Sequence, residues 1–352
     1  MRLPFRAKEK LIVGIDIGSH SVKVCQLERI EQGYSVLSLG SALLPEGAVD
    51  DGTLHDPDQV GEIISQLLKH LKIKDRKIGF SVSGYSVVVK KINLPAMDEQ
   101  LLKEHILSEA EQYIPFDLNE VYLDFQDLQT NRDDMAKTSI ILAAAKKEVI
   151  DPYLEMFKAI NLLPVIVDVD GFALENAYEY NYLKNENIAL VDIGAAKINV
   201  NIISREASIM ARDIVVGSRE LTDQLQYEFD LDPEEAEALK LGASAANDRQ
   251  EMIEEIFHTR CVQWMEEIKK TINLYHATNR REPLTKLIIS GGGSNIRGLT
   301  QFLEKKIGLP VERFNPFTKM IANPKTIDPE YLKQIGPEMA IAAGLAIRPS
   351  AI

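Results

Sequence analysis

The chain has 352 residues, of which 45% are hydrophobic and 26% are charged, an ordinary composition for a folded globular protein. Its formal net charge of -13 argues against a nucleic acid as partner, because a phosphate backbone repels an acidic protein. Two cysteines, Cys25 and Cys261, lie far apart and outside any Cys-x-x-Cys spacing. They support neither a disulfide framework nor a zinc site, and they fit a reducing compartment.

The first ten residues, MRLPFRAKEK, contain basic side chains but no apolar stretch, so they do not predict a secretory signal. No segment approaches the roughly 20 consecutive apolar residues that a membrane-spanning helix needs. We therefore expect a cytosolic protein that reaches a membrane only through a partner.

The first predicted element is a hairpin over residues 11–28, LIVGIDIGSHSVKVCQLE, with a further strand at 34–39. An apolar strand runs into Asp-Ile-Gly, and a second strand follows a short polar turn. Glycine allows close approach of a ligand, and successive N–H groups in such a turn form an anion-binding nest. Asp16 would be repelled by phosphate, but its carboxylate can hold, through water, the magnesium that accompanies ATP.

The same pattern returns at residues 188–204, IALVDIGAAKINVNIIS, followed by a strand at 207–216. Ile198, Val200 and Ile202 alternate with asparagines, which is the period of a strand with one buried face. One Asp-x-Gly alone is most often only a turn that suits these residues. Two copies, each opening a three-stranded meander, indicate a duplicated domain with a phosphate-binding turn in each half.

A third glycine-rich element, LIISGGGSNIRGL, spans residues 287–299. An apolar strand runs into three glycines, and a helix follows whose predicted end is at Gly308. The element lacks the Gly-Lys-Ser/Thr of a Walker loop and fails the Rossmann spacing. Taken alone, it is a weak signal for a ligand site.

These three elements, in this order, resemble the actin, sugar-kinase and heat-shock-chaperone superfamily, where they are two phosphate loops and an adenosine loop. The resemblance implies an α/β protein with an actin-like ATPase fold, in which two related domains surround a nucleotide cleft. Residues 167–177 and 336–346 resemble the two connecting helices of this fold, rich in small residues that allow close packing. Asp170 would then occupy the place where the chaperones carry a catalytic glutamate.

Over essentially its whole length the sequence is also similar to the PilM family of type IV pilus assembly proteins, which is related to the division protein FtsA. The resemblance rests on VGIDIGSHSVKV, VVKKINLPAMDE, EAEQYIPFDLNEV, and IISGGGSNIRGL with FNPF after it. It implies an FtsA-type α+β insertion in the first domain. The expected elements of the insertion are a strand at 87–92, a helix at 99–113, strands at 120–128 and 137–145, and a helix at 148–160.

The resemblance also predicts four subdomains. They are a first core of 1–85 with 165–187 and 337–352, the insertion at 86–164, a second core of 188–217 with 286–336, and a small helix-rich subdomain at 218–285.

The resemblance implies that ATP and Mg bind in the cleft. The residues implied to contact the nucleotide are Asp16, Gly18, Ser19, His20, Ser21, Lys23, Asp192, Gly194, Ala195, Lys197, Glu237, Lys240, Gly291, Gly292, Gly293 and Asn295. Asp16 and Asp192 would hold the magnesium, through water. The alternatives are an ordinary strand-face charge for Lys23 and an exposed ion pair for Glu237 with Lys240.

The second phosphate loop departs from its relatives, which carry further glycine and threonine residues after the Asp-x-Gly. Here Gly194 is followed by Ala195, Ala196 and Lys197, so the side-chain hydroxyls are lost. Hydrolysis requires an oriented water and donors aimed at developing charge. We therefore expect ATP binding with slow or absent hydrolysis, with the nucleotide acting as a clamp between the domains. Lys197 either offsets phosphate charge or points to solvent.

The family resemblance implies an adaptor that binds the cytosolic N-terminal tail of the inner-membrane protein PilN. In the family this peptide lies in a groove between the first core and the insertion. Leu94, Pro95, Ile114, Pro115 and Phe116 are candidate lining residues, because apolar loop residues beside a helix are typical of docking surfaces. The alternative is that they cap the insertion's own core.

Two other functions stay open on this fold: an FtsA-like self-assembling division protein and, less favoured, a small-molecule kinase. Because the chain ends in IRPSAI rather than an amphipathic helix, we do not expect direct membrane anchoring. A kinase would need a general base beside an acceptor hydroxyl and a fuller second phosphate loop.

Overall fold

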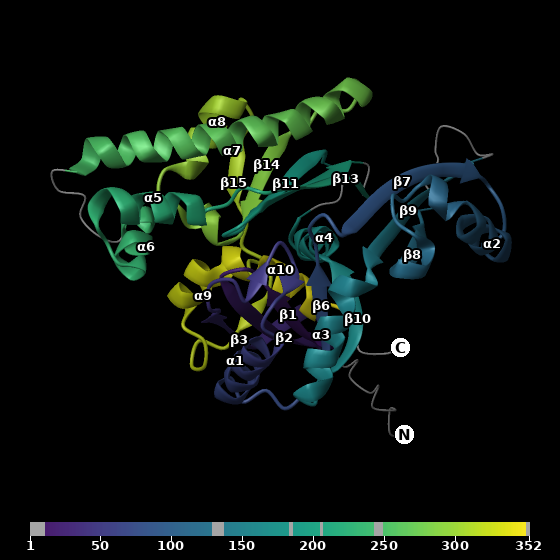
Figure 1. Cartoon of the computed structure of the whole chain (residues 1–352), viewed down its shortest axis with the longest axis horizontal. Coiled ribbons are helices and arrows are strands. Elements are labelled where there is room, and N and C mark those ends of the chain that lie inside the picture. The colour runs from purple at the N-terminus through teal and green to yellow at the C-terminus, as the bar shows by residue number, and fades with distance from the viewer. Residues whose placement is uncertain (1–10, 129–136, 183–185, 205–206, 243–248, 350–352) are drawn as a thin grey trace.

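The computed structural model describes residues 11–128, 137–182, 186–204, 207–242 and 249–349. Expectations for residues 1–10 and 350–352 lie outside these ranges. Two mixed sheets form the body of the protein, and each is built on one Asp-Ile-Gly hairpin (Figure 1).

Within the described residues, the first sheet has six strands in the order β10-β6-β1-β2-β3-β16. Strands β1, β2 and β3 form the predicted antiparallel meander, and β6 and β10 extend it in parallel on the other side of β1. The bounds are β1 Val13–Ile17, β2 Ser21–Ile30, β3 Gly33–Leu43, β6 Lys77–Val82, β10 Leu163–Val169 and β16 Ile321–Ala322. A short hairpin, β4 Val49–Asp50 with β5 Thr53–Leu54, lies between β3 and helix α1 in the chain.

The second sheet repeats this arrangement in the order β13-β12-β11-β14-β15. Its meander is again antiparallel, and β14 and β15 again extend the first strand of the meander in parallel. The bounds are β11 Ile188–Ile193, β12 Ile198–Ser204, β13 Ala207–Ile214, β14 Lys286–Ser290 and β15 Val311–Arg313. The duplication predicted from the two hairpins is therefore present in the topology of both sheets.

A smaller unit leaves the first sheet after β6. Its three strands pair in the order β7-β9-β8, and its core holds apolar residues of the strands together with Leu102 and Ile106 of helix α2. The bounds are β7 Val87–Pro95, α2 Glu99–Glu109, β8 Val121–Asp127 and β9 Lys137–Lys146, with 3-10 turns at Ala110–Gln112 and Leu118–Glu120. This is the α+β insertion that the sequence predicts.

Helix α3 (Lys147–Ala159) follows the insertion in the chain but packs with the first sheet. Its buried side chains include Val149, Tyr153 and Phe157, at helical spacing, and they share a core with helix α1 (Pro57–His70) and strand β6. We therefore propose that the inserted unit ends with β9, ahead of the boundary expected at residue 164.

Helices cover the second sheet, as expected for residues 218–285. The long helix α7 lies across this half (Figure 1), and its Trp264, Ile268 and Tyr275 are buried against the sheet. The bounds of these helices are α5 Arg219–Phe229, α6 Pro233–Leu241, α7 Gln250–Thr278 and α8 Leu299–Ile307. Helix α9 (Pro329–Ile335) packs with the first sheet instead, where Ile335 shares a core with Leu27 of β2. No helix in the described part of the chain combines the length and the apolar character needed to cross a membrane.

Two short helices, α4 (Asp170–Asn181) and α10 (Ala340–Ala346), pack against each other between the two sheets. Every residue of α10 is buried. The backbones touch: a Cβ added at Gly344 would lie 1.7 Å from the carbonyl oxygen of Ala173, and one at Gly14 would lie 2.1 Å from that of Ala342. The small residues that predict the connecting helices are therefore required by their contact.

We expect Gly344→Ala to destabilise the protein by about 2 kcal/mol or more, because a methyl group would overlap the backbone of α4 and force the helices apart. Urea unfolding checks this. Gly61→Ala in α1 is the matched control, since its new Cβ would meet only side-chain atoms at 3.3 Å and would gain helix propensity. Equal stability of the two variants would contradict the prediction.

Candidate functional site

The two Asp-Ile-Gly turns face each other across a small cleft of about 80 Å³. Each turn is closed by the same hydrogen bond: the Gly18 N–H donates to the carbonyl of Ser21 at 3.1 Å, and the Gly194 N–H donates to that of Lys197 at 2.9 Å. The predicted site residues that line the cleft are Asp16, Gly18, Ser19, His20, Lys23, Asp170, Asp192, Gly194, Ala195 and Lys197.

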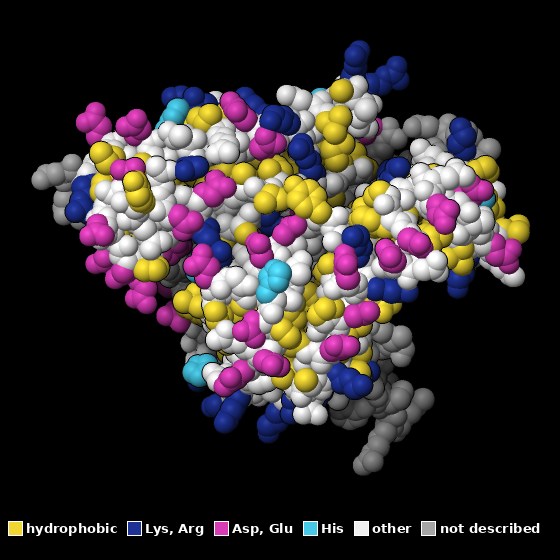
Figure 2. Space-filling view, viewed as in Figure 1, with side chains coloured by type: hydrophobic (Ala, Val, Ile, Leu, Met, Phe, Trp, Pro, Cys, Tyr) yellow, Lys and Arg dark blue, Asp and Glu magenta, His cyan; other side chains and the backbone are white. Residues whose placement is uncertain are grey.

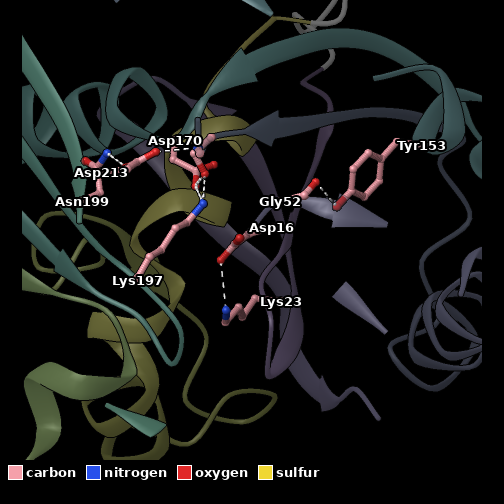
Figure 3. A network of polar contacts seen from close by, with 10 residues as sticks. Asp16, Lys23, Gly52, Tyr153, Asp170, Lys197, Asn199 and Asp213 are labelled. Carbon is pink, nitrogen blue, oxygen red and sulfur yellow. Dashed lines mark hydrogen bonds and ion pairs between the residues drawn. The ribbon is translucent and has the colours of Figure 1, made fainter. Parts of the chain in front are cut away.

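In the first turn, Lys23 and Asp16 are adjacent across the β1–β2 hairpin, and the Lys23 Nζ lies 3.2 Å from the Asp16 Oδ2 (Figure 3). Burial raises the pKa of the Asp16 carboxyl although Lys23 opposes it. Burial alone would lower the pKa of Lys23, but Asp16 and Asp192 outweigh it and raise that pKa. Lys23 therefore faces the cleft as a cation.

In the second sheet, Asp192 is the corresponding carboxylate, and it accepts a hydrogen bond from Ser290 at 2.9 Å. Burial, reinforced by the charge of Asp16, raises the pKa of Asp192 to about 6. The described residues contain no cluster of three or more His, Cys, Asp or Glu that could hold a metal ion. Asp16 and Asp192 thus fit a magnesium ion only if phosphate and water supply its remaining ligands.

Lys197 crosses the cleft from the second sheet toward the first (Figure 3). Its Nζ lies 3.6 Å from the Asp170 Oδ2 and donates a hydrogen bond to the hydroxyl of Ser83, which itself donates to Asp170. Burial would lower the pKa of Lys197, but Asp170 and neighbouring carboxylates raise it. The sequence left open whether Lys197 lies at the phosphate loop or points to solvent. In the structure its side chain lies inside the cleft.

Two further contacts join the halves of the chain around this cleft. The Asp213 Oδ2 accepts a hydrogen bond from the Gly84 N–H at 2.5 Å, while its Oδ1 accepts one from Asn199 at 2.7 Å (Figure 3). The guanidinium of Arg219 donates to the carbonyl of Ser19 at 2.9 Å. Sequence reasoning missed Ser83, which lines the cleft, and it missed Gly84, Asp213 and Arg219, which join the two halves beside it. These residues lie outside the repeated hairpin turns, and only the fold brings them together.

The remaining predicted nucleotide contacts do not line this cleft; they are Ser21, Glu237, Lys240, Gly291, Gly292, Gly293 and Asn295. On α6, the Lys240 Nζ is buried, lies 2.6 Å from the Glu237 Oε2 and donates to Thr222 at 2.9 Å. Burial lowers the pKa of Lys240. It is therefore not the exposed surface charge that the alternative required. Glu237 and Lys240 also act on the pKa of His20, which burial lowers, so they are close to the first turn.

Two of the three glycines, Gly291 and Gly293, serve the packing of the second sheet as well as any ligand. A Cβ on Gly291 would lie 2.5 Å from the carbonyl oxygen of Ile193, and one on Gly293 would lie 2.4 Å from the Ile193 side chain. Gly292 is different, since its nearest neighbour is Glu338 at 3.8 Å. Asn295 donates to that same Glu338 at 3.3 Å, so Glu338 is a further polar group that sequence analysis missed.

A second and larger cavity, of about 510 Å³, lies between the insertion and the first sheet and is called the groove below. One wall is β8 with part of β9, and the other is the end of β10 with α4. Both β8 and β10 are edge strands of their sheets. The lining residues are Val82, Val87, Tyr122, Leu123, Asp124, Phe125, Gln126, Leu128, Ile141, Ala143, Ala144, Ala145, Ile150, Val167, Asp168, Val169, Phe172, Glu175, Asn176, Glu179, Ser208 and Arg348.

None of the five residues predicted to bind a peptide lines this groove. Leu94 and Ile114 are buried in the insertion's own core, and Phe116 packs against that core. Pro95 and Pro115 are exposed beside it. For the three apolar side chains of the core, the structure supports the alternative that they cap the insertion, because they fill the space between its sheet and helix α2.

Two sheets that share the order of five strands are joined by two packed helices and face each other with one Asp-Ile-Gly turn apiece, and this arrangement defines an actin-like ATPase fold. The sequence pattern of type IV pilus assembly protein PilM matches residues 14–350, and the chain belongs to this family.

The solved structure titled PilM-PilN type IV pilus biogenesis complex superimposes with a TM-score of 0.85 at 26% identity, covering 98% of this chain and 100% of that one. Cell division protein FtsA of Buchnera aphidicola is 23% identical over 379 residues, covering 93% of this chain and 90% of that protein. MreB 5 of Spiroplasma citri, solved with AMPPNP, shares the fold at 11% identity and a TM-score of 0.53, covering 96% and 95% of the two chains.

We expect Asp192→Asn to stabilise the protein at pH 7.5 by on the order of 1–3 kcal/mol, measured without nucleotide and with EDTA. The pKa of Asp192 in the folded chain, about 6, exceeds its ordinary value of 3.8. Between these two pH values the folded chain therefore binds more protons than the unfolded chain. The unfolding free energy of the wild type therefore falls as pH rises through this window. The variant has no carboxyl at this position, so its unfolding free energy does not fall for this reason. Urea unfolding at pH 4.5 and 7.5 should show a gain that grows with pH.

The exposed Asp50→Asn is the control and should change the unfolding free energy little at either pH. A loss of stability in Asp192→Asn at pH 7.5, or a gain that is equal at both pH values, would show that burial of this carboxylate carries no such cost.

Proposed function

We propose that this chain is a nucleotide-binding adaptor of type IV pilus assembly, which holds the cytosolic N-terminal tail of PilN in the groove. The observation that carries this proposal is the groove itself, about 510 Å³ between edge strands of two different sheets. The protein would act in the cytoplasm and be recruited to the inner membrane through PilN.

The walls of the groove suit an extended peptide. An edge strand offers main-chain groups to an added strand, and side-chain pockets beside it select the sequence. Val167 on β10 and Tyr122 on β8 are apolar groove residues that are 40% and 45% exposed. Such side chains gain free energy when a partner covers them.

The charge of the groove favours a peptide that carries a basic side chain. Asp124 and Asp168 line it, and Arg348 lies 3.3 Å from the Asp168 Oδ2. Acidic side chains also recur across the face of the molecule drawn in Figure 2. Complementary charge raises the association rate and disfavours acidic partners.

In the cleft, the backbone N–H groups of the two turns and the ammonium groups of Lys23 and Lys197 would bind the phosphates of ATP. A bound magnesium, held through water by Asp16 and Asp192, would supply further neutralisation of phosphate charge. Asp170 stays the candidate for orienting water. Its contacts with Lys197 and Ser83 support slow or absent hydrolysis, because those contacts compete with a water for the carboxylate.

The cleft and the groove share the ends of two strands. Val82, the last residue of β6, lines both cavities, and the next residue, Ser83, contacts Lys197. At the end of β10, Asp168 lines the groove while Asp170, two residues on, lines the cleft. A ligand that moves either strand end would change both sites.

We expect a labelled peptide from the cytosolic N-terminus of PilN to bind saturably in fluorescence anisotropy. Val167→Asp should weaken binding at least roughly tenfold, because it places a charge against an apolar wall of the groove. Leu163→Asp is the matched control on the same strand, 54% exposed but outside the groove, and should bind as the wild type does.

The double variant Pro115→Ala, Phe116→Ala separates the groove from the loop that the sequence had indicated. It should retain peptide binding if the protein stays folded by circular dichroism. Loss of binding in this variant with no effect of Val167→Asp would overturn the groove assignment, and no binding by the wild type would overturn the adaptor function.

We further expect Mg-ATP to change the affinity for the PilN peptide by roughly 5-fold or more, in the range of ordinary coupling free energies. The same peptide should change the affinity for ATP by the same factor, since coupling is reciprocal. Anisotropy with and without ATP, and calorimetry of ATP with and without peptide, test this. If ATP and the peptide bind independently, the shared strand ends do not couple the cleft to the groove.

A further inference from the structure

We propose that the ammonium of Lys197 neutralises phosphate charge in the cleft, a role that a divalent ion would otherwise fill. Nucleotide binding by this chain therefore depends little on magnesium. The inference rests on the proposed binding of nucleotide in the cleft. It concerns one side chain, which reaches from the second hairpin across the cleft to Asp170 and Ser83.

The turn that carries Lys197 is fixed by its own backbone. The Gly194 N–H donates to the Lys197 carbonyl, the Ser218 N–H donates to the Gly194 carbonyl, and the Arg219 N–H donates to the Ala195 carbonyl, each at 2.9 Å. A Cβ on Gly217 would meet the Ala195 carbonyl oxygen at 2.2 Å, so this contact leaves the turn no room to shift. The Lys197 side chain is therefore directed across the cleft from a rigid base.

The ammonium occupies a strongly acidic place. Asp170 lies 3.6 Å away, and the charges of Asp213 on β13, Asp51 in the β4–β5 turn and Asp16 on β1 add to its effect in raising the pKa of Lys197. The side chain of Lys197 is only 22% exposed, so solvent screens these charges less than at the surface. Carboxylates from different elements thus surround one fixed positive charge, as they would surround a bound cation.

The carboxylates expected to hold magnesium are already engaged. Asp16 is ion-paired with Lys23 at 3.2 Å, and Asp192 accepts a hydrogen bond from Ser290 at 2.9 Å. Two lysines, one from each hairpin, therefore face the phosphate position together with them. A lysine is a point charge with three donors and needs no ligand cage, so it can contact phosphate oxygens directly.

The test is calorimetric titration of ATP into the full chain in two buffers. One contains about 2 mM MgCl2, and the other contains EDTA, which removes the magnesium. For the wild type, we expect the dissociation constant to differ by less than about fivefold between the buffers. Lys197→Met keeps the length of the side chain without its charge, and should weaken binding in EDTA by roughly 10- to 100-fold. Magnesium should restore part of that loss.

Lys197→Arg should keep most of the affinity in EDTA, and Lys158→Met, an exposed lysine of α3, is the control for loss of a distant charge. Circular dichroism and thermal unfolding establish that each variant is folded. A wild type whose affinity falls at least tenfold in EDTA, or a Lys197→Met variant with the same affinities as the wild type, would overturn the inference while leaving nucleotide binding intact. No binding of ATP in either buffer would overturn both.

Discussion

The arrangement of both sites depends on the close contact between helices α4 and α10. Each sheet could bury one face with its own helices, but the two halves are joined where the backbone of Gly344 meets that of Ala173. Helices this close require residues without side-chain bulk, and backbone contact leaves little freedom of rotation about the joint. Because α4 begins at Asp170, the same contact sets the position of a cleft residue.

Because α4 and α10 hold the two halves together, charged groups from both halves lie in one buried cleft. Asp16 and Lys23 come from the first hairpin and Asp192 and Lys197 from the second, while Asp170 stands at the start of the helix between them. Burying charges costs free energy unless they are paired, and the pairs seen here offset that cost in part. Clusters of this kind, with pKa values displaced by burial, are typical of functional sites rather than of cores optimised for stability.

The insertion adds a second cavity beside the first sheet. It leaves the first sheet directly after β6 and places its edge strand β8 opposite the edge strand β10. The groove therefore exists only because two sheets end side by side, and one of its walls is continuous with the ends of β6 and β10, which also reach the cleft. Actin-like topology thus supplies the cleft, and one inserted unit adds the groove.

The sequence by itself determined the repeated parts. Alternating apolar residues and the Asp-Ile-Gly turns predict both meanders, because these signals are local and periodic. The helices that join the meanders are expected from the family resemblance, and the small residues around Gly344 fit their close packing. The expected boundaries of β8 and β9 in the insertion hold to within one residue, whereas β7 continues to Pro95, beyond its expected end at residue 92. The helix at 147–159 shows the limit, since its apolar stripe predicts a helix without saying which core it joins.

Only the tertiary structure decided which side chains meet. Ser83, Asp213 and Glu338 carry no local signal, and they meet Asp170, Gly84 and Asn295 from separate elements of the fold. From sequence alone, Leu94 and Ile114 fit a docking surface and a hydrophobic core equally well. In the structure they pack with α2 in the core of the insertion. Hydrophobic periodicity fixes which face of an element is buried, whereas the partner of that face depends on contacts between residues far apart in the chain.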